Sequence, residues 1–195
     1  MRTVSLPESS EARPDILIPA RTLSELARIL PADGPVEMLV TPQRSQVLFH
    51  TPTLDLVTRL IEGTFPNYRQ IIPDDYTSRV VVETSALVQS IKAAALFARE
   101  SANAVYLTLG AGESATLTVE ARTDETGENV SVLEVSVEGP AMTIAFNVRY
   151  LADVLAVIDA PEVALEFVSP SKPAVLKPVG HPEYLYVAMP MHINR

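Results

Sequence analysis

The chain has 195 residues, of which 47% are hydrophobic, and its formal net charge is −9. A chain of this size and composition can bury a substantial core in one or two domains. It has no apolar run of the roughly 18 residues that a transmembrane helix needs, and residues 1–11 lack the apolar centre of a secretory signal. The absence of cysteine excludes disulfides and thiolate metal sites. These features favour a cytoplasmic protein, and the acidic balance argues against indiscriminate coating of nucleic acid.

Three stretches repeat one pattern, in which an apolar run leads into an amphipathic segment. They occupy residues 18–23, 82–87 and 146–151, each ending in leucine, and 87 − 23 and 151 − 87 both equal 64. A fixed period indicates one supersecondary unit repeated along the chain, and a unit that cannot bury its apolar face alone packs against a copy of itself. Three is an odd number, so one unit has no counterpart to pair with in this sequence.

Each repeat is predicted to form a strand, a helix and then about three strands. The helices show the apolar spacing of surface helices, and Thr22, Ser85 and Asn147 suit N-caps or first helical turns. The predicted buried faces are Leu23, Leu26, Ala27 and Leu30 in the first helix, Leu87, Ile91, Ala94 and Ala98 in the second, and Leu151, Val154, Leu155 and Ile158 in the third.

Alternation with period two predicts strands in residues 54–61, 116–121 and 132–137. Residues 7–14 form a polar, proline-bearing loop, and residues 122–129 form an acidic hairpin tip. The turn-forming residues 73–77 separate the first repeat from the second and are the favoured domain boundary.

The sequence contains no arrangement typical of an active site. His50, His181 and His192 stand apart without metal-binding spacing. The acidic pairs Asp74–Asp75 and Glu125 with Glu128 fall in predicted turns. A glycine-rich phosphate loop and a nucleophile elbow are both lacking. We therefore predict a non-catalytic protein that needs neither a metal nor a cofactor.

Three motifs appear in a fixed order. The first is Glu62-Gly63-Thr64-Phe65-Pro66-Asn67-Tyr68, the second is Phe146-Asn147-Val148-Arg149-Tyr150-Leu151, and the third is Met189-Pro190-Met191. Their order and spacing resemble the bacterial sliding clamp, the beta subunit of DNA polymerase III. The resemblance covers essentially all of the chain but only the C-terminal half of the family's sequence.

The resemblance implies an α+β DNA clamp fold, in which strand–helix–three-strand half-domains pair and place their helices on one face of antiparallel sheets. Residues 1–77 would be the second half of the family's middle domain. Residues 78–195 would be its complete C-terminal domain, built from half-units at about 78–140 and 141–195.

By the same resemblance, the chain is a processivity factor of bacterial DNA replication and repair, located at the nucleoid, that encircles duplex DNA without reading its sequence. The helices facing the DNA need positive charge. An alternative interpretation is that these cations are ordinary solvated helix charges. The candidate DNA-facing residues are Arg21, Arg28, Lys92, Arg99 and Arg149.

The family also docks DNA polymerase, clamp loader and repair proteins, whose short peptides insert into an apolar pocket. A methionine-rich cleft suits several related peptides, although Val187 and Met189 could equally be core residues of an ordinary strand. Family clamps complete this pocket with a "DGHRL" strand, at whose last position Met1 stands here. The positions implied are Pro66, Gln70, Ile71, Asn147, Tyr150, Ser171, Pro173, Val187, Ala188, Met189, Pro190 and Met191.

The unpaired first repeat predicts self-association, because it exposes an apolar helix face and a strand edge. Family rings contain twelve half-units, so chains with three half-units would form a dimer at least, and four chains would close a ring. Leu26 is expected on the pairing face. The alternative is a truncated clamp isoform or fragment, an interaction module that binds clamp partners or a full-length clamp without encircling DNA itself.

Overall fold

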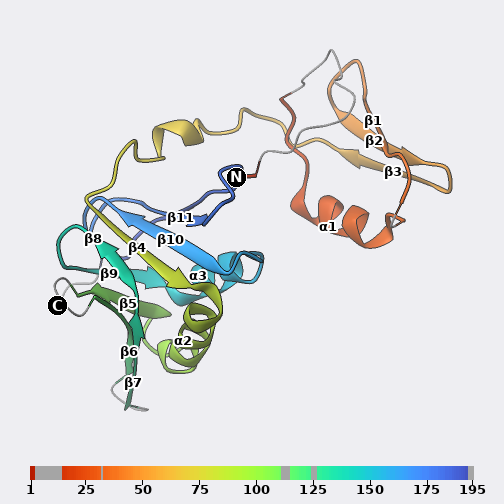
Figure 1. The fold of residues 1–195 in the computed structure, drawn as a ribbon. Helices are drawn as coiled ribbons and strands as arrows, with labels where there is room; N and C mark the ends of the chain where they lie inside the picture. Colours follow the sequence, from red (N-terminus) through yellow and green to blue (C-terminus); the bar gives the residue numbers. More distant parts are fainter. Residues whose placement is uncertain (3–14, 32, 111–114, 124–126, 193–195) are drawn as a thin grey trace. The chain divides into compact units, whose positions relative to one another are not determined.

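The computed structural model describes residues 1–2, 15–31, 33–110, 115–123 and 127–192. The chain forms two compact units (Figure 1). The N-terminal unit is Leu6–Asn67, and the C-terminal unit is Met1–Ser5 together with Tyr68–Arg195. The loop expected at residues 7–14 lies outside the described residues. The polar stretch 73–77 lies inside the C-terminal unit.

The described part of the N-terminal unit contains one helix and one small sheet. Helix α1 (Ala20–Ile29) is followed by strands β1 (Glu37–Val40), β2 (Gln46–Thr51) and β3 (Leu54–Arg59), which pair antiparallel in the order β1-β2-β3. The predicted helix and the strand beginning at residue 54 are thus confirmed. The strand expected before α1 is not formed within residues 15–19. The Ile61 N–H donates to the Leu17 carbonyl (2.8 Å), but this bond is not part of a continuous ladder, which a strand requires.

The core of this unit is small. Leu26, Val47 and Phe49 are buried, with Ile18 and Leu30 packed against them. The placement of Leu26 on a pairing face was therefore wrong, because its side chain fills the interior of its own unit. The outward-facing leucine of α1 is Leu23, which is exposed.

In its described residues, the C-terminal unit contains two α-helices, one short 3-10 helix and two antiparallel sheets (Figure 1). One sheet has the strand order β12-β11-β10-β4-β8, and the other has the order β7-β6-β5-β9. Its elements are the 3-10 helix η1 (Tyr68–Gln70), β4 (Ser78–Glu83), α2 (Thr84–Ala98), β5 (Ala104–Leu109), β6 (Thr116–Thr123), β7 (Gly127–Glu134), β8 (Ser136–Glu138), β9 (Met142–Asn147), α3 (Val148–Leu155), β10 (Glu162–Phe167), β11 (Ala174–Pro178) and β12 (Tyr186–Ala188).

The two repeats of this unit exchange their first strands. Strand β4 begins the second repeat but pairs with β10 of the third, whereas β9 begins the third repeat and pairs with β5 of the second. Helices α2 and α3 pack against each other. Neither repeat therefore completes its sheet alone. The 64-residue period corresponds to two units that pair by exchanging strands.

The predicted patterns are largely confirmed in this core. Leu117, Val119 and Ala121 are fully buried along β6, as their alternation indicated. The Asn147 side chain caps α3 by accepting a hydrogen bond from the Arg149 N–H at 3.0 Å. Ile158 lies beyond the end of α3 but remains buried.

Two boundaries differ from the sequence prediction. Strands β6 and β7 stay paired up to Thr123 opposite Gly127, so Arg122 and Glu128 belong to strands rather than to a hairpin tip. Cross-strand attraction supports this pairing, because the Arg122 guanidinium lies 3.2 Å from the Glu128 carboxylate. The stretch 132–137 is divided between β7 and β8, which belong to different sheets.

Candidate partner-binding and DNA-facing sites

The start of α3 and strand β12 come together in the C-terminal unit. Asn147 caps the helix, and Tyr150 projects from its first turn with an exposed ring. Helix α3 packs against β12. Partial burial raises the pKa of Tyr186 above its ordinary value, and the Asp153 carboxylate and Tyr150 raise it further. The Tyr186 phenol thus stays neutral at ordinary pH.

Residues 189–192 form a tail that follows β12. Along β12 and into this tail, the side chains alternate between the core and the surface. Ala188 is buried opposite Ala174, whereas Val187 is half-buried opposite Val175. Met189 follows the strand and is 60% exposed. The core residue of this segment is therefore Ala188, and the side chains of Val187 and Met189 reach the surface.

The C-terminal tail is attached to the edge of β9. The Met191 N–H donates to the Ala145 carbonyl at 2.8 Å. Ser171, in the loop between β10 and β11, and Met191 both line a hollow of about 280 Å³. Pro173 is half-buried just before β11, and Pro190 is half-buried within the tail.

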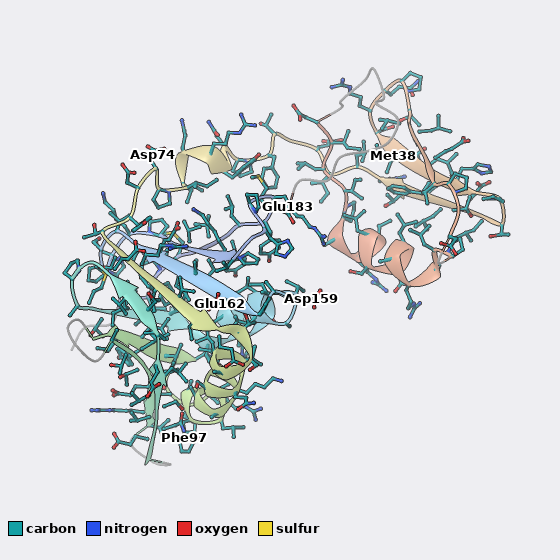
Figure 2. The ribbon with its side chains drawn as sticks, viewed as in Figure 1. Met38, Asp74, Phe97, Asp159, Glu162 and Glu183 are labelled. Atoms are coloured by element: carbon teal, nitrogen blue, oxygen red, sulfur yellow. The ribbon has the colours of Figure 1, made fainter. Side chains whose placement is uncertain are left out.

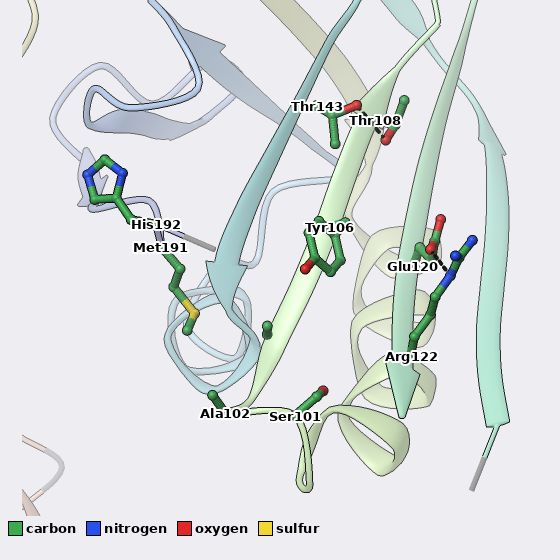
Figure 3. Close-up of a pocket in the computed structure, with 10 residues that line it drawn as sticks. Ser101, Ala102, Tyr106, Thr108, Glu120, Arg122, Thr143, Met191 and His192 are labelled. Atoms are coloured by element: carbon green, nitrogen blue, oxygen red, sulfur yellow. Dashed lines mark hydrogen bonds and ion pairs between the residues drawn. The ribbon is translucent and has the colours of Figure 1, made fainter. Parts of the chain in front are cut away.

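A second, larger groove of about 910 Å³ adjoins this hollow on the outer face of β5, β6 and β9 (Figure 3). Tyr106 and Met191 line both. The hydroxyls of Thr108 and Thr143 lie 3.0 Å apart across its floor. Sequence reasoning did not identify this surface, although the buried alternation of β5 implies that Tyr106 and Thr108 point outward.

The remaining predicted pocket residues lie near the beginning of the C-terminal unit or outside it. Gln70 ends η1, Ile71 follows it, and both are exposed. The Met1 carbonyl accepts a hydrogen bond from the Leu185 N–H at 3.0 Å, which places Met1 beside the segment that leads into β12. Pro66 belongs to the N-terminal unit.

The candidate DNA-facing cations are all exposed on helices or at a helix end. Helix α1 carries Arg21 and Arg28 against one acidic residue, Glu25, whose carboxylate lies 2.6 Å from the Arg28 guanidinium. Lys92 lies on α2, and Arg99 is its C-cap residue. Arg149 lies on α3, which is adjacent to α2 (Figure 1). Each unit thus presents positive charge from its helices in an otherwise acidic chain.

Two of the three histidines, His50 and His181, lie in surface pairs with acidic side chains. His50 Nδ1 lies 2.5 Å from the Asp55 carboxylate, and this hydrogen bond raises the pKa of the imidazole. His181 lies 3.1 Å from Glu183. Within the described residues no cluster of histidine and acidic side chains could hold a metal ion. Glu125 lies outside those residues. None of the described helices meets the length and hydropathy that crossing a membrane requires.

Comparison with known proteins identifies related chains. Residues 69–192 match the family model of the DNA polymerase III beta subunit, C-terminal domain, and residues 1–67 match that of its central domain. The beta sliding clamp of Caulobacter vibrioides is 29% identical over 188 residues, which are 96% of this chain and 49% of the relative. That of Staphylococcus aureus is 29% identical over 192 residues, 98% of this chain and 50% of the relative.

Solved structures agree with these matches. The DNA polymerase sliding clamp from Bacillus subtilis superposes with a TM-score of 0.90 at 26% identity, covering 99% of this chain and 50% of that one. The beta subunit from Thermotoga maritima superposes with a TM-score of 0.82 at 25% identity, covering 92% of this chain and 48% of that one. The chain spans about half the length of the curated relatives it matches. The α+β clamp fold is confirmed, and the chain belongs to the DNA polymerase III beta subunit family.

Proposed function

We propose that this chain acts as a DNA sliding clamp, a non-catalytic processivity factor that surrounds duplex DNA and tethers a polymerase to it in the bacterial cytoplasm. The observation that carries the proposal is the likeness to sliding clamps along nearly the whole chain, in sequence and in fold. In this proposal the helix cations attract the DNA, and the exposed Met189 contacts partner peptides.

In this proposal the DNA is held by enclosure and by weak attraction of phosphates to the helix cations. Arg21 and Arg28 lie two turns apart on α1, so they share one side of the helix. Contacts of this kind carry no sequence information, because the phosphate backbone is the same for every base pair. Binding should therefore depend on salt and not on sequence.

The partner-binding part of the proposal assigns short peptides of DNA polymerase, clamp loader and repair proteins to the surface of β12 and the tail. Met189 and Val187 offer apolar contacts at the surface, and Tyr150 offers an exposed ring nearby on α3. A flexible methionine can adapt to different apolar anchors, which suits a surface shared by several peptides.

Self-association is the third part of the proposal. A family ring contains twelve half-units, and each copy of this chain contributes three repeats. A ring of the same size would therefore need four copies. A dimer through the N-terminal unit is the minimal form, because this unit leaves apolar side chains of α1 and β1 exposed.

A second function has its own supporting observation. The chain spans half the length of its relatives, so a surface that binds clamp peptides, or a full-length clamp, could act without enclosing DNA. This interaction module would use the β12 surface and would leave the helix cations without a role.

Retention on circular DNA distinguishes the two functions. The full chain, incubated with a clamp loader and a nicked circular duplex, should co-elute with the circle in gel filtration and be lost when the circle is cut once. Equal retention on circular and linear DNA would reject enclosure. Peptide binding without any DNA retention would favour the interaction module.

A further inference from the structure

The same helix position has a different environment in the three repeats. Leu87 on α2 is 1% exposed and Leu151 on α3 is 2% exposed, and both belong to the single buried core that the two repeats share. Leu23 occupies the equivalent position on α1 and is 43% exposed. The N-terminal unit therefore leaves exposed a leucine that its two counterparts bury, and no second helix packs against α1 within the described residues.

The strand after the helix shows the same difference. Val105 is the second residue of β5 and pairs with the exchanged strand β9. Val163 is the second residue of β10 and pairs with the exchanged strand β4. Both valines are fully buried. Met38 is the second residue of β1 and is 48% exposed (Figure 2). It lies opposite the buried Phe49, so it faces the core side of the sheet. Among the described residues, no strand pairs with the free edge of β1.

The segment before α1 has the sequence of an exchanged strand. Moving 64 residues along the chain takes Ile16 and Ile18 to Val80 and Val82 of β4, and another 64 takes them to Ile144 and Phe146 of β9. The side chains of β4 and β9 at these positions are buried in the core that the two repeats share. Residues 15–19 carry the same apolar alternation without forming a strand.

We propose that two copies of this chain complete each other's N-terminal unit by exchanging these segments. Residues 15–18 of each copy add antiparallel to β1 of the other, and the two Leu23 side chains become buried in the core that the two copies then share. The pairing of β9 with β5 and of β4 with β10 fixes the register. Ile18 lies opposite the partner's Met38, and Ile16 lies opposite the partner's Val40.

A second copy is the occupant that this geometry favours. Each N-terminal unit holds both a segment to donate and a free edge to receive one, so the contact is self-complementary and closes with two-fold symmetry. Strand addition supplies the backbone bonds, and the apolar side chains supply the contact area. The inference deepens the proposed self-association by naming the surface through which it occurs.

Cysteine pairing tests the register directly, because the native chain has no cysteine. One preparation carries Ile18→Cys and a second, with a different tag, carries Met38→Cys. After mixing and mild oxidation we expect a disulfide-linked species carrying both tags, since each chain has a single thiol. Leu39→Cys is the matched control: Leu39 is the neighbour of Met38 and is also exposed, but it faces the other side of β1. It should cross-link at least tenfold less.

Light scattering of the wild-type chain at tens of micromolar separates the possible failures. A monomer would overturn both strand exchange and the proposed self-association. A dimer in which Met38→Cys and Leu39→Cys cross-link equally would overturn strand exchange alone. The pair Ile16→Cys with Val40→Cys gives an independent test of the same register, in case Ile18→Cys fails to fold by circular dichroism.

Discussion

The two units of this molecule show one sequence pattern in two situations. In the C-terminal unit, two repeats exchange strands and bury Leu87 and Leu151 in one common core. In the N-terminal unit, a single repeat keeps a small core around Leu26 and leaves Leu23 exposed. The difference teaches that the local sequence specifies the helix and the hairpin, whereas burial of the apolar face depends on a second repeat.

Truncation of the repeat leucines should give the largest effect. Leu87→Ala removes a buried side chain, and we expect it to lower the free energy of unfolding of the C-terminal unit by about 2–5 kcal/mol. Leu23→Ala, at the same repeat position, should cost the monomeric N-terminal unit less than about 1 kcal/mol because Leu23 is already 43% exposed. Urea denaturation with hydrogen exchange in each unit measures both. Equal losses would contradict the comparison.

The surface of β12 should contribute to peptide binding and little to stability. Met189→Ala should weaken the binding of a polymerase-derived clamp peptide by roughly 1–3 kcal/mol, the usual scale for an apolar anchor. Fluorescence anisotropy measures the affinity. Val179→Ala, which also truncates an exposed apolar residue of the C-terminal unit, is the control and should leave the affinity unchanged. Unchanged affinity in Met189→Ala would remove Met189 from the site.

The helix cations should contribute a smaller, salt-dependent effect. Replacing Arg21 and Arg28 together with Glu should reduce DNA association and flatten the dependence of log K on log salt by about 2, because two phosphate contacts are lost. Arg59→Glu, which changes an exposed arginine on β3, is the control and should change the slope little. A strong preference for one duplex sequence in competition would contradict enclosure and would indicate base readout.

The smallest effect concerns pH in the N-terminal unit. The hydrogen bond to Asp55 raises the pKa of His50 in the folded state, so the stabilisation is complete below the unfolded pKa and is lost as the pH rises through the folded pKa. Thermal melting should therefore show a slight loss of stability across that interval, and Asp55→Asn should abolish it. A transition temperature that rises through the same interval would have the wrong sign.

Local features of the fold could be predicted from single stretches of sequence. The alternation of Leu117 and Val119 identified β6, and the side-chain chemistry of Asn147 identified the start of α3. The exchange of β4 and β9 could not be read this way, because periodicity says which residues are apolar and not which strand lies beside which. For the same reason the sequence assigned Leu26 to a pairing face, although it belongs to the core of its own unit.

The candidate sites were less accessible to sequence reasoning than the fold. The residues of the β12 surface were predicted only from the resemblance to a family. Spacing alone would not have predicted that Tyr150 on α3 lies near a strand more than thirty residues later in the chain. The alternation of β5 could have predicted that Tyr106 points outward into the groove. The other walls of the groove come from β6, β9 and the tail, which meet only after folding.

The central claim is that the N-terminal unit is an unpaired repeat completed by a second copy. Hydrogen exchange over a series of protein concentrations tests it most directly. The edge amides of β1 should become more protected as concentration rises, because the added strand binds them, while the amides of β5 should stay equally protected throughout. Exchange in β1 that is independent of concentration, up to tens of micromolar, would contradict the claim.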